Sequence, residues 1–148
     1  MIIEFEVDGA PFGKERGRAR SFVGKDNKLK TRVYGQERTA AYEKRVAEAY
    51  KAAAGGFRFD DDAPLMVIIT AYYPIPTSDS KKKKALKLEG RILPTKRPDW
   101  DNIGKVVCDG LQRDGAAMKD DSRIAYGSVG KFYSDRPRVH VIIKEYQA

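Results

Sequence analysis

Residues 65–73 have the sequence LMVIITAYY, and this run decides the fold class. It is apolar and rich in β-branched side chains over nearly its whole length, which is typical of a strand in the centre of a sheet. Pro74 and Pro76 end the run, because proline cannot donate a hydrogen bond to a neighbouring strand. The chain is therefore expected to be built around a sheet.

Further strands are predicted on both sides of this run, at residues 2–8, 123–133 and 137–145. In the first of them, Ile3, Phe5 and Val7 alternate with acidic residues, as in a strand with one buried face. The last two strands are joined near Ser134-Asp135-Arg136.

Helices are predicted at residues 37–54, 80–88 and 102–112. The first has a periodic face made of Tyr42, Val46, Ala49, Tyr50 and Ala53, and it ends at Gly55-Gly56. The second is expected to be capped by Ser78 or Asp79, and the third has an inner face of Ile103, Val106, Val107 and Leu111. The order of elements predicts a single α+β domain over residues 1–148, with helices packed on a mixed sheet.

The composition favours a nucleic-acid partner. The 148 residues include 29 Lys and Arg against 21 Asp and Glu, a net charge of +8. Cys108 is the only cysteine, which excludes an intramolecular disulfide, and we expect it to be a small buried residue in a cytoplasmic protein. We expect no membrane span or signal peptide, and no nucleotide cofactor, because apolar runs are short and no phosphate-binding loop is present.

Two basic segments are candidates for contact with the DNA backbone. Residues 14–32 form a basic loop with room for short strands, and Lys14, Arg16, Arg18 and Arg20 are expected to bind DNA. The second segment is the run Lys81, Lys82, Lys83 and Lys84. A solvated helix face explains this lysine run equally well.

The acidic segment KRPDWDNIGK at residues 96–105 carries the chemistry. Asp99 and Asp101 are two apart in a stretch expected to be extended, so their carboxylates point the same way. A return loop after the following helix brings Asp121 beside Asp99 if the fold allows it. Three close carboxylates with hard oxygen ligands favour Mg²⁺ or Mn²⁺. Lys105, one helical turn after Asp101, is placed to contact the scissile phosphate or to stabilise the attacking hydroxide or the leaving oxygen.

Each of these residues also has an ordinary structural interpretation. Asp101 could cap the helix, Lys105 could pair with Asp101 or Asp109, and Asp120-Asp121 could be turn residues. The sole histidine, His140, is expected to be structural, which argues against sites that need paired histidines. Trp100 is expected to pack in the core rather than stack on a base.

In combination the motifs resemble those of RusA-type Holliday-junction resolvases. The resemblance rests on Lys96-Arg97-Pro98-Asp99-x-Asp101-Asn102-Ile103-x-Lys105, on Asp109-Gly110-Leu111 and Gly115, on Asp120-Asp121-x-x-Ile124, and on Gly9-x-Pro11-x-x-Lys14-x-Arg16-x-Arg18. Gly17 departs from the family pattern, which has proline there, and Ala116-Ala117-Met118 replaces a frequent aromatic residue.

The resemblance implies a RusA-like fold and a homodimer with one site per subunit, encoded by a bacterium, phage or prophage. It implies that Asp99, Asp101 and Asp121 hold Mg²⁺ or Mn²⁺, that the neighbouring acid Asp120 contributes a metal ligand or a water contact, and that Lys105 is the catalytic lysine. The sequence thus predicts a nuclease that resolves four-way DNA junctions by paired nicks. A non-catalytic basic DNA-binding protein and a nuclease for flaps or other branched DNA remain as alternatives.

Overall fold

A mixed sheet forms the centre of the protein in the computed structural model, which describes residues 1–15, 18–34, 36–59 and 62–148. Its four strands have the order β1-β6-β4-β5. They are β1 (Ile2–Asp8), β4 (Leu65–Pro74), β5 (Ile124–Ser134) and β6 (Arg138–Glu145). β6 pairs antiparallel with both β1 and β4, whereas β5 pairs parallel with β4. The central position of β4 and the α+β class are confirmed.

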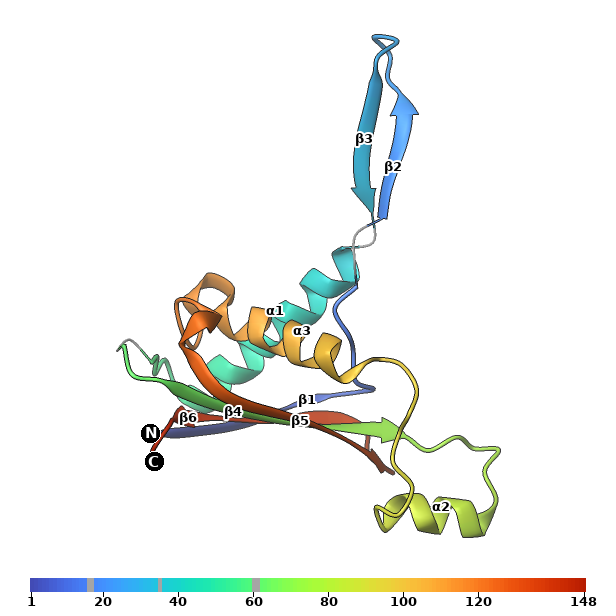
Figure 1. Ribbon diagram of the computed structural model, residues 1–148, viewed down its shortest axis with the longest axis vertical. Helices are drawn as coiled ribbons and strands as arrows, with labels where there is room; N and C mark the ends of the chain where they lie inside the picture. The colour runs from blue at the N-terminus through green and yellow to red at the C-terminus, as the bar shows by residue number, and fades with distance from the viewer. Residues whose placement is uncertain (16–17, 35, 60–61) are drawn as a thin grey trace.

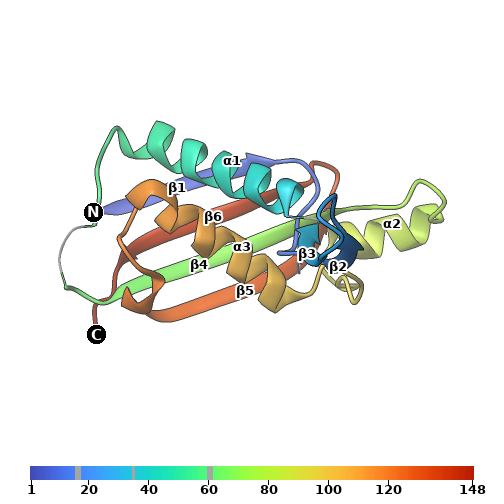
Figure 2. The ribbon, with the colours of Figure 1, turned by 90° about the horizontal axis from the view of Figure 1, so that it is seen from above.

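Two helices cover one face of this sheet. α1 (Glu37–Ala54) lies over β1, and α3 (Trp100–Gln112) lies over β5 (Figure 1 and Figure 2). The parallel pairing of β4 with β5 requires a long crossover, and this crossover contains α2 (Lys81–Leu88), α3 and the short 3-10 helices η1 (Arg113–Gly115) and η2 (Asp121–Arg123). None of the helices within the described ranges combines the length and apolar character needed to cross a bilayer.

The core lies between the helices and the sheet. The predicted inner face of α3 is confirmed, since Ile103, Val106, Val107 and Leu111 are fully buried. On α1, Tyr42, Val46 and Tyr50 are buried and Ala49 is half-buried, but Ala53 is exposed. That part of the prediction is wrong: Ala54, the last residue of α1, packs against the core in place of Ala53.

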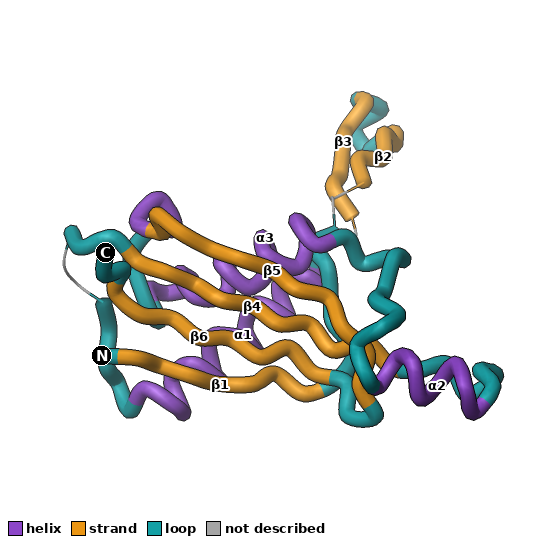
Figure 3. The backbone as a smooth tube through the Cα atoms, turned by 60° about the horizontal axis from the view of Figure 1, so that its bottom comes forward, coloured by secondary structure: helices purple, strands orange, loops and turns teal. Residues whose placement is uncertain are grey.

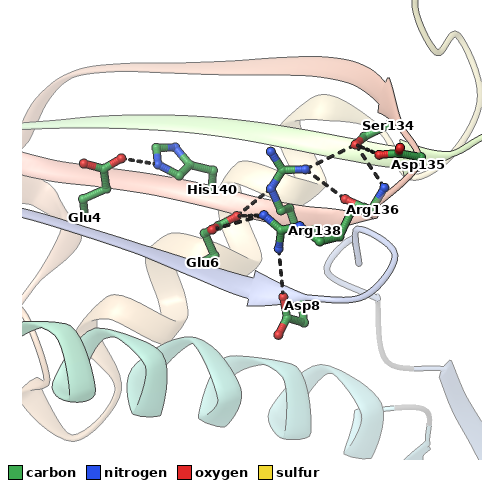
Figure 4. A network of polar contacts seen from close by, with 8 residues as sticks. All are labelled: Glu4, Glu6, Asp8, Ser134, Asp135, Arg136, Arg138 and His140. Carbon is green, nitrogen blue, oxygen red and sulfur yellow. Dashed lines mark hydrogen bonds and ion pairs between the residues drawn. The ribbon is translucent and has the colours of Figure 1, made fainter. Parts of the chain in front are cut away.

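The opposite face of the sheet carries no helix (Figure 3). It holds a network of ion pairs between β1, β6 and the turn before β6 (Figure 4). Arg138 lies 2.5 Å from Glu6, Arg136 bridges Glu6 and Asp8, and His140 Nε2 lies 2.6 Å from Glu4 Oε1. The contact with Glu4 agrees with a structural place for His140.

The basic segment after β1 forms a hairpin of β2 (Arg18–Val23) and β3 (Leu29–Tyr34), which projects from the helix-covered side of the sheet (Figure 1). Its turn uses the left-handed conformation of Asn27, at φ 60°. The short strands that the sequence allowed here are therefore present.

The cap predicted for α2 is wrong. Ser80, not Ser78 or Asp79, is the N-cap, and its hydroxyl accepts a hydrogen bond from the Lys83 amide at 3.2 Å. The Asp79 carboxylate is occupied by the Lys87 ammonium at 2.5 Å.

Candidate active site

The first turn of α3 is held in place from two sides. At the end of β4, the Tyr73 hydroxyl donates to the Pro98 carbonyl at 2.5 Å. From the segment after β1, the Lys14 amide donates to the Asn102 carbonyl at 3.0 Å. A side chain at Gly13 would lie 2.7 Å from the Pro98 Cβ, so only glycine allows this close approach. Segments distant in sequence thus fix the position of the acidic motif.

Asp109, on the next turns of α3, is the centre of a polar cluster. Its side chain is only 9% exposed, and it contacts the ammonium groups of Lys14 and Lys105, the latter at 3.1 Å. Gln112 Nε2 donates to it at 3.3 Å. Burial alone raises the pKa of Asp109, but the hydrogen bonds from the two lysines outweigh burial and hold the pKa below its usual value. Asp109 is therefore a buried anion that orders two cations.

Lys105 lies between two carboxylates. Besides Asp109, its Nζ lies 3.6 Å from Asp121 Oδ2, and its side chain remains 53% exposed. The hydrogen bond to Asp109, with a smaller contribution from Asp121, raises the pKa of Lys105. A charged ammonium is thus held in place while still open to a ligand.

Asp121 follows α3 through η1 and returns to the side of the helix. Its amide donates to the Gln112 Oε1 at 2.9 Å, so Gln112 connects Asp121 to Asp109. The neighbouring Asp120 caps η2 by accepting from the Ser122 amide at 2.8 Å, and this bond lowers the pKa of Asp120. The interpretation of Asp120 as a turn residue matches this contact.

Asp99 and Asp101 lie at the start of α3. Asp99 is the N-cap with extended backbone, but its carboxylate makes no capping hydrogen bond, and neither side chain has a hydrogen-bond or ion-pair partner among the described residues. Burial and then the negative charge of Asp99 raise the pKa of the Tyr73 hydroxyl to about 12. Both carboxylates are exposed and available to a ligand.

The expected convergence of the acids has a different geometry in the structure. Asp101 is already in the first turn of α3, so the argument from an extended stretch is wrong. Asp121 lies beside Lys105, about one helical turn after Asp101. Within the part of the chain that the structure describes, no three Asp, Glu, His or Cys residues form a group able to hold a metal ion. The donors are of the right chemical type for a hard divalent cation, but they are not gathered around one point.

Two members of the cluster were missed from the sequence, Glu43 and Gln112. Glu43 lies on α1 and contacts Lys14 at 3.9 Å and Arg113 at 3.3 Å. No local pattern points to Glu43, because its partners are far away along the chain. By contrast, the spacing of Lys105 and Asp109 by four residues was a signal for their contact, and that alternative is confirmed.

The other residues selected from the sequence have varied surroundings. Lys14 is already paired with Asp109, Arg16 and the side chain of Arg18 lie outside what the structure describes, and Arg20 lies on the projecting hairpin. On α2, Lys81, Lys82 and Lys83 are exposed and Lys84 is half-buried.

Two residues differ from their expected burial. Trp100 is 63% exposed, so its predicted packing in the core is wrong; it is the first residue of α3 and lies between the exposed Asp99 and Asp101. Cys108 is only partly buried, and burial raises the pKa of its thiol to about 11, with the nearby Asp121 and Asp109 adding to the effect. Its thiol therefore stays protonated at neutral pH.

Comparison with known proteins gives a family and one relative. A protein of Bacillus subtilis (strain 168), described as an uncharacterized protein named YqaN, is 42% identical over 87 residues. These residues cover 57% of this chain and 60% of that protein, so less than two thirds of the relative is matched. The family described as endodeoxyribonuclease RusA matches residues 8–144. The match extends from the end of β1 to the end of β6, and the chain therefore belongs to the RusA endodeoxyribonuclease family.

Proposed function

We propose that this protein is a metal-dependent nuclease that resolves four-way DNA junctions by paired nicks. It acts in the cytoplasm of a bacterium, and its gene belongs to the bacterium or to a phage or prophage. The observation that carries the proposal is the arrangement on α3. Lys105 is held between Asp109 and Asp121. Asp101 lies about one helical turn before it and Asp99 less than two turns before it, and neither carboxylate has a partner among the described residues. Membership of an endodeoxyribonuclease family supports it.

Asp99, Asp101 and Asp121 would hold Mg²⁺ or Mn²⁺ after their carboxylates turn toward the ion, since they are not gathered around one point in the structure, and the neighbouring Asp120 would contribute a ligand or a water contact. Such an ion activates water and offsets the negative charge that develops on a phosphate during hydrolysis. Lys105 donates a hydrogen bond to an oxygen of the scissile phosphate. Its raised pKa keeps it charged at neutral pH, and the buried carboxylate of Asp109 orients it beforehand, so little reorganisation is needed when DNA binds.

The β2–β3 hairpin supplies contacts to a DNA arm. Arg20 and Phe22 are two residues apart on β2 and therefore share a face, and Lys30 of β3 lies opposite Phe22 on that face. One face of the ribbon therefore combines cations with an aromatic residue, a combination typical of nucleic-acid contact. A two-stranded ribbon also has the width of the major groove. The exposed lysines of α2 are a second region for phosphate contact.

A homodimer provides two such sites for two symmetric nicks. The helix-free sheet face is where we place the partner, and Phe132, 38% exposed, lies there beside Tyr72. Tyr133 points to the opposite face, against Tyr73, and contributes nothing to this surface.

Light scattering measures the mass of the protein in solution and so tests whether it is a dimer. Mixed dimers of wild type and Asp101→Asn should nick one strand without releasing linear duplexes. Full paired resolution by a monomer would contradict the dimer.

The nuclease proposal is tested with a labelled four-way junction, a flap and a matched linear duplex, each with Mg²⁺, with Mn²⁺ and with EDTA. We expect symmetric cleavage of the junction only with metal. Asp99→Asn, Asp101→Asn and Asp121→Asn should lose cleavage but keep junction binding, because each removes a ligand charge without adding bulk. Asp135→Asn, an exposed acid in the β5–β6 turn, is the matched control. Binding without metal-dependent cleavage of any substrate would support a non-catalytic DNA-binding protein instead.

A further inference from the structure

Trp100 has no place in the chemistry proposed so far, although it separates Asp99 from Asp101. It is the only tryptophan of the chain and is 63% exposed. Its ring has no aromatic or cation partner among the described residues, in contrast to the stacked pair of Phe12 and Tyr42 nearby in the fold. A large apolar ring is thus left in water beside the acidic motif.

The backbone beneath this ring is held firmly. The carbonyl of Pro98 accepts a hydrogen bond from Tyr73 of β4, and the carbonyl of Asn102 accepts one from the segment after β1. The Ile103 amide donates to the Asp99 carbonyl at 3.0 Å and closes the first helical turn. Ile103 itself is fully buried. An exposed aromatic residue on a fixed backbone loses little conformational freedom when a ligand stacks on it.

The surroundings select a nucleic acid as the ligand. Lys96 and Arg97 are exposed immediately before the motif, and the chain as a whole carries a net charge of +8. A base has a flat apolar face for the ring and a phosphate for the neighbouring cations. In a continuous duplex both faces of each base are covered by its neighbours, so a free face exists only where strands branch or are unpaired.

We propose that Trp100 stacks on the face of a base exposed at a DNA branch point, next to the phosphate that is cut. Trp100 is then a positioning residue that also distinguishes branched DNA from linear duplex. This inference rests on the proposed nuclease function. Since Asp99 and Asp101 are its immediate neighbours in the chain, stacking sets the strand against the two carboxylates.

The sole tryptophan reports directly on this contact. Intrinsic fluorescence is recorded in EDTA, which prevents metal-dependent cleavage, while a four-way junction or a linear duplex of the same arm sequence is added. Anisotropy of a fluorescein-labelled copy of each DNA measures binding separately. We expect the junction to quench the Trp100 emission as it binds, and the duplex to bind with little quenching.

Variants give the second measurement. Trp100→Ala should bind the junction about 5- to 150-fold more weakly, the range expected from losing one base stack, with duplex binding unchanged. Trp100→Phe should keep part of the difference, because it retains a ring. The thermal unfolding midpoint of both variants should match the wild type, since the ring is not part of the core.

The possible failures are distinguishable. Junction binding without quenching, or equal quenching by junction and duplex, overturns the role of Trp100 but leaves the nuclease proposal intact. Emission that shifts to the blue with protein concentration in the absence of DNA assigns the ring to a contact between copies and overturns the inference. No binding to any DNA overturns the proposed function, and the inference with it.

Discussion

Asp109→Asn tests whether one buried carboxylate organises the cluster on α3. The substitution keeps the shape of the side chain but removes its charge. Hydrogen bonds that involve charged groups contribute about 1.5–3 kcal/mol each. Here the loss is smaller, because Lys14 and Lys105 have side chains 37% and 53% exposed, and water can take over part of the solvation of their ammonium groups.

Each lysine also keeps a second carboxylate after the substitution. Lys14 lies 3.9 Å from Glu43, and Lys105 lies 3.6 Å from Asp121. We therefore expect Asp109→Asn to lower the free energy of unfolding by about 1–2 kcal/mol, and the thermal midpoint by about 2–8 °C. Asp101→Asn is the matched control, because Asp101 has no such partner among the described residues, and its effect should stay within about 0.5 kcal/mol.

The pH dependence of this difference has a definite sign. The pKa of Asp109 is lower in the folded protein than in the unfolded chain, so its charge stabilises the fold above the usual Asp pKa. That contribution is lost as the pH falls through the folded value. Urea unfolding of wild type and Asp109→Asn from pH 7 to pH 3 should show a gap in unfolding free energy that begins to narrow below about pH 4. Equal midpoints at pH 7, or a gap that persists unchanged into acid, would refute the role assigned to Asp109.

Three further changes test the packing, the chemistry and the DNA contacts. Gly110→Ala places a Cβ 2.6 Å from the Val46 Cβ and should lower the free energy of unfolding in urea by about 1–3 kcal/mol. The control Gly104→Ala faces only a Val129 methyl group at 3.2 Å and should lower it by less. Equal losses in the two variants would contradict the close contact of α1 and α3. Lys105→Ala should slow single-turnover junction cleavage by about 100- to 1000-fold without unfolding the protein. Lys105→Arg should not fully restore the cleavage rate. A wild-type rate in Lys105→Ala would make Lys105 a surface residue without a role in cleavage. Replacement of Lys25, Lys28 and Lys30 by Ala should reduce the log–log salt slope of binding by about 0.9 per lost phosphate contact, and an unchanged slope would remove the hairpin from the interface. The same measurement on Lys81–Lys84 distinguishes a DNA-binding α2 from a solvated one.

The parts of the fold that follow local rules could be predicted from the sequence. The four buried residues of α3 have helical spacing, and β1 alternates as a strand with one covered face. The start of α3 could not be predicted, because contacts of Pro98 with β4 and of Asn102 with the segment after β1 help fix it. This shift of two residues is enough to change the relative direction of Asp99 and Asp101.

The site was predictable only in part for the same reason. The acids and Lys105 are recognisable from their order and spacing, and Lys105 and Asp109 meet through helical geometry alone. Glu43 reaches the cluster from α1 because Gly110 lets the two helices come close, a relation between elements that no local pattern encodes. Trp100 has a side chain type that usually favours burial, but its position at the first turn of a surface helix overrides that preference.

The position of β6 inside the sheet also has a consequence for synthesis on the ribosome. β1 pairs with β6 along its whole length, from Ile2 opposite Lys144 to Asp8 opposite Arg138. At about 5–20 residues per second, roughly 7–30 s separate the translation of these two strands. During that interval β1 has no hydrogen-bonding neighbour of its own, since β6 also separates it from β4. The backbone of β1 therefore lacks its sheet partner until β6 emerges, and during this interval its unpaired edge is open to aggregation and to chaperones.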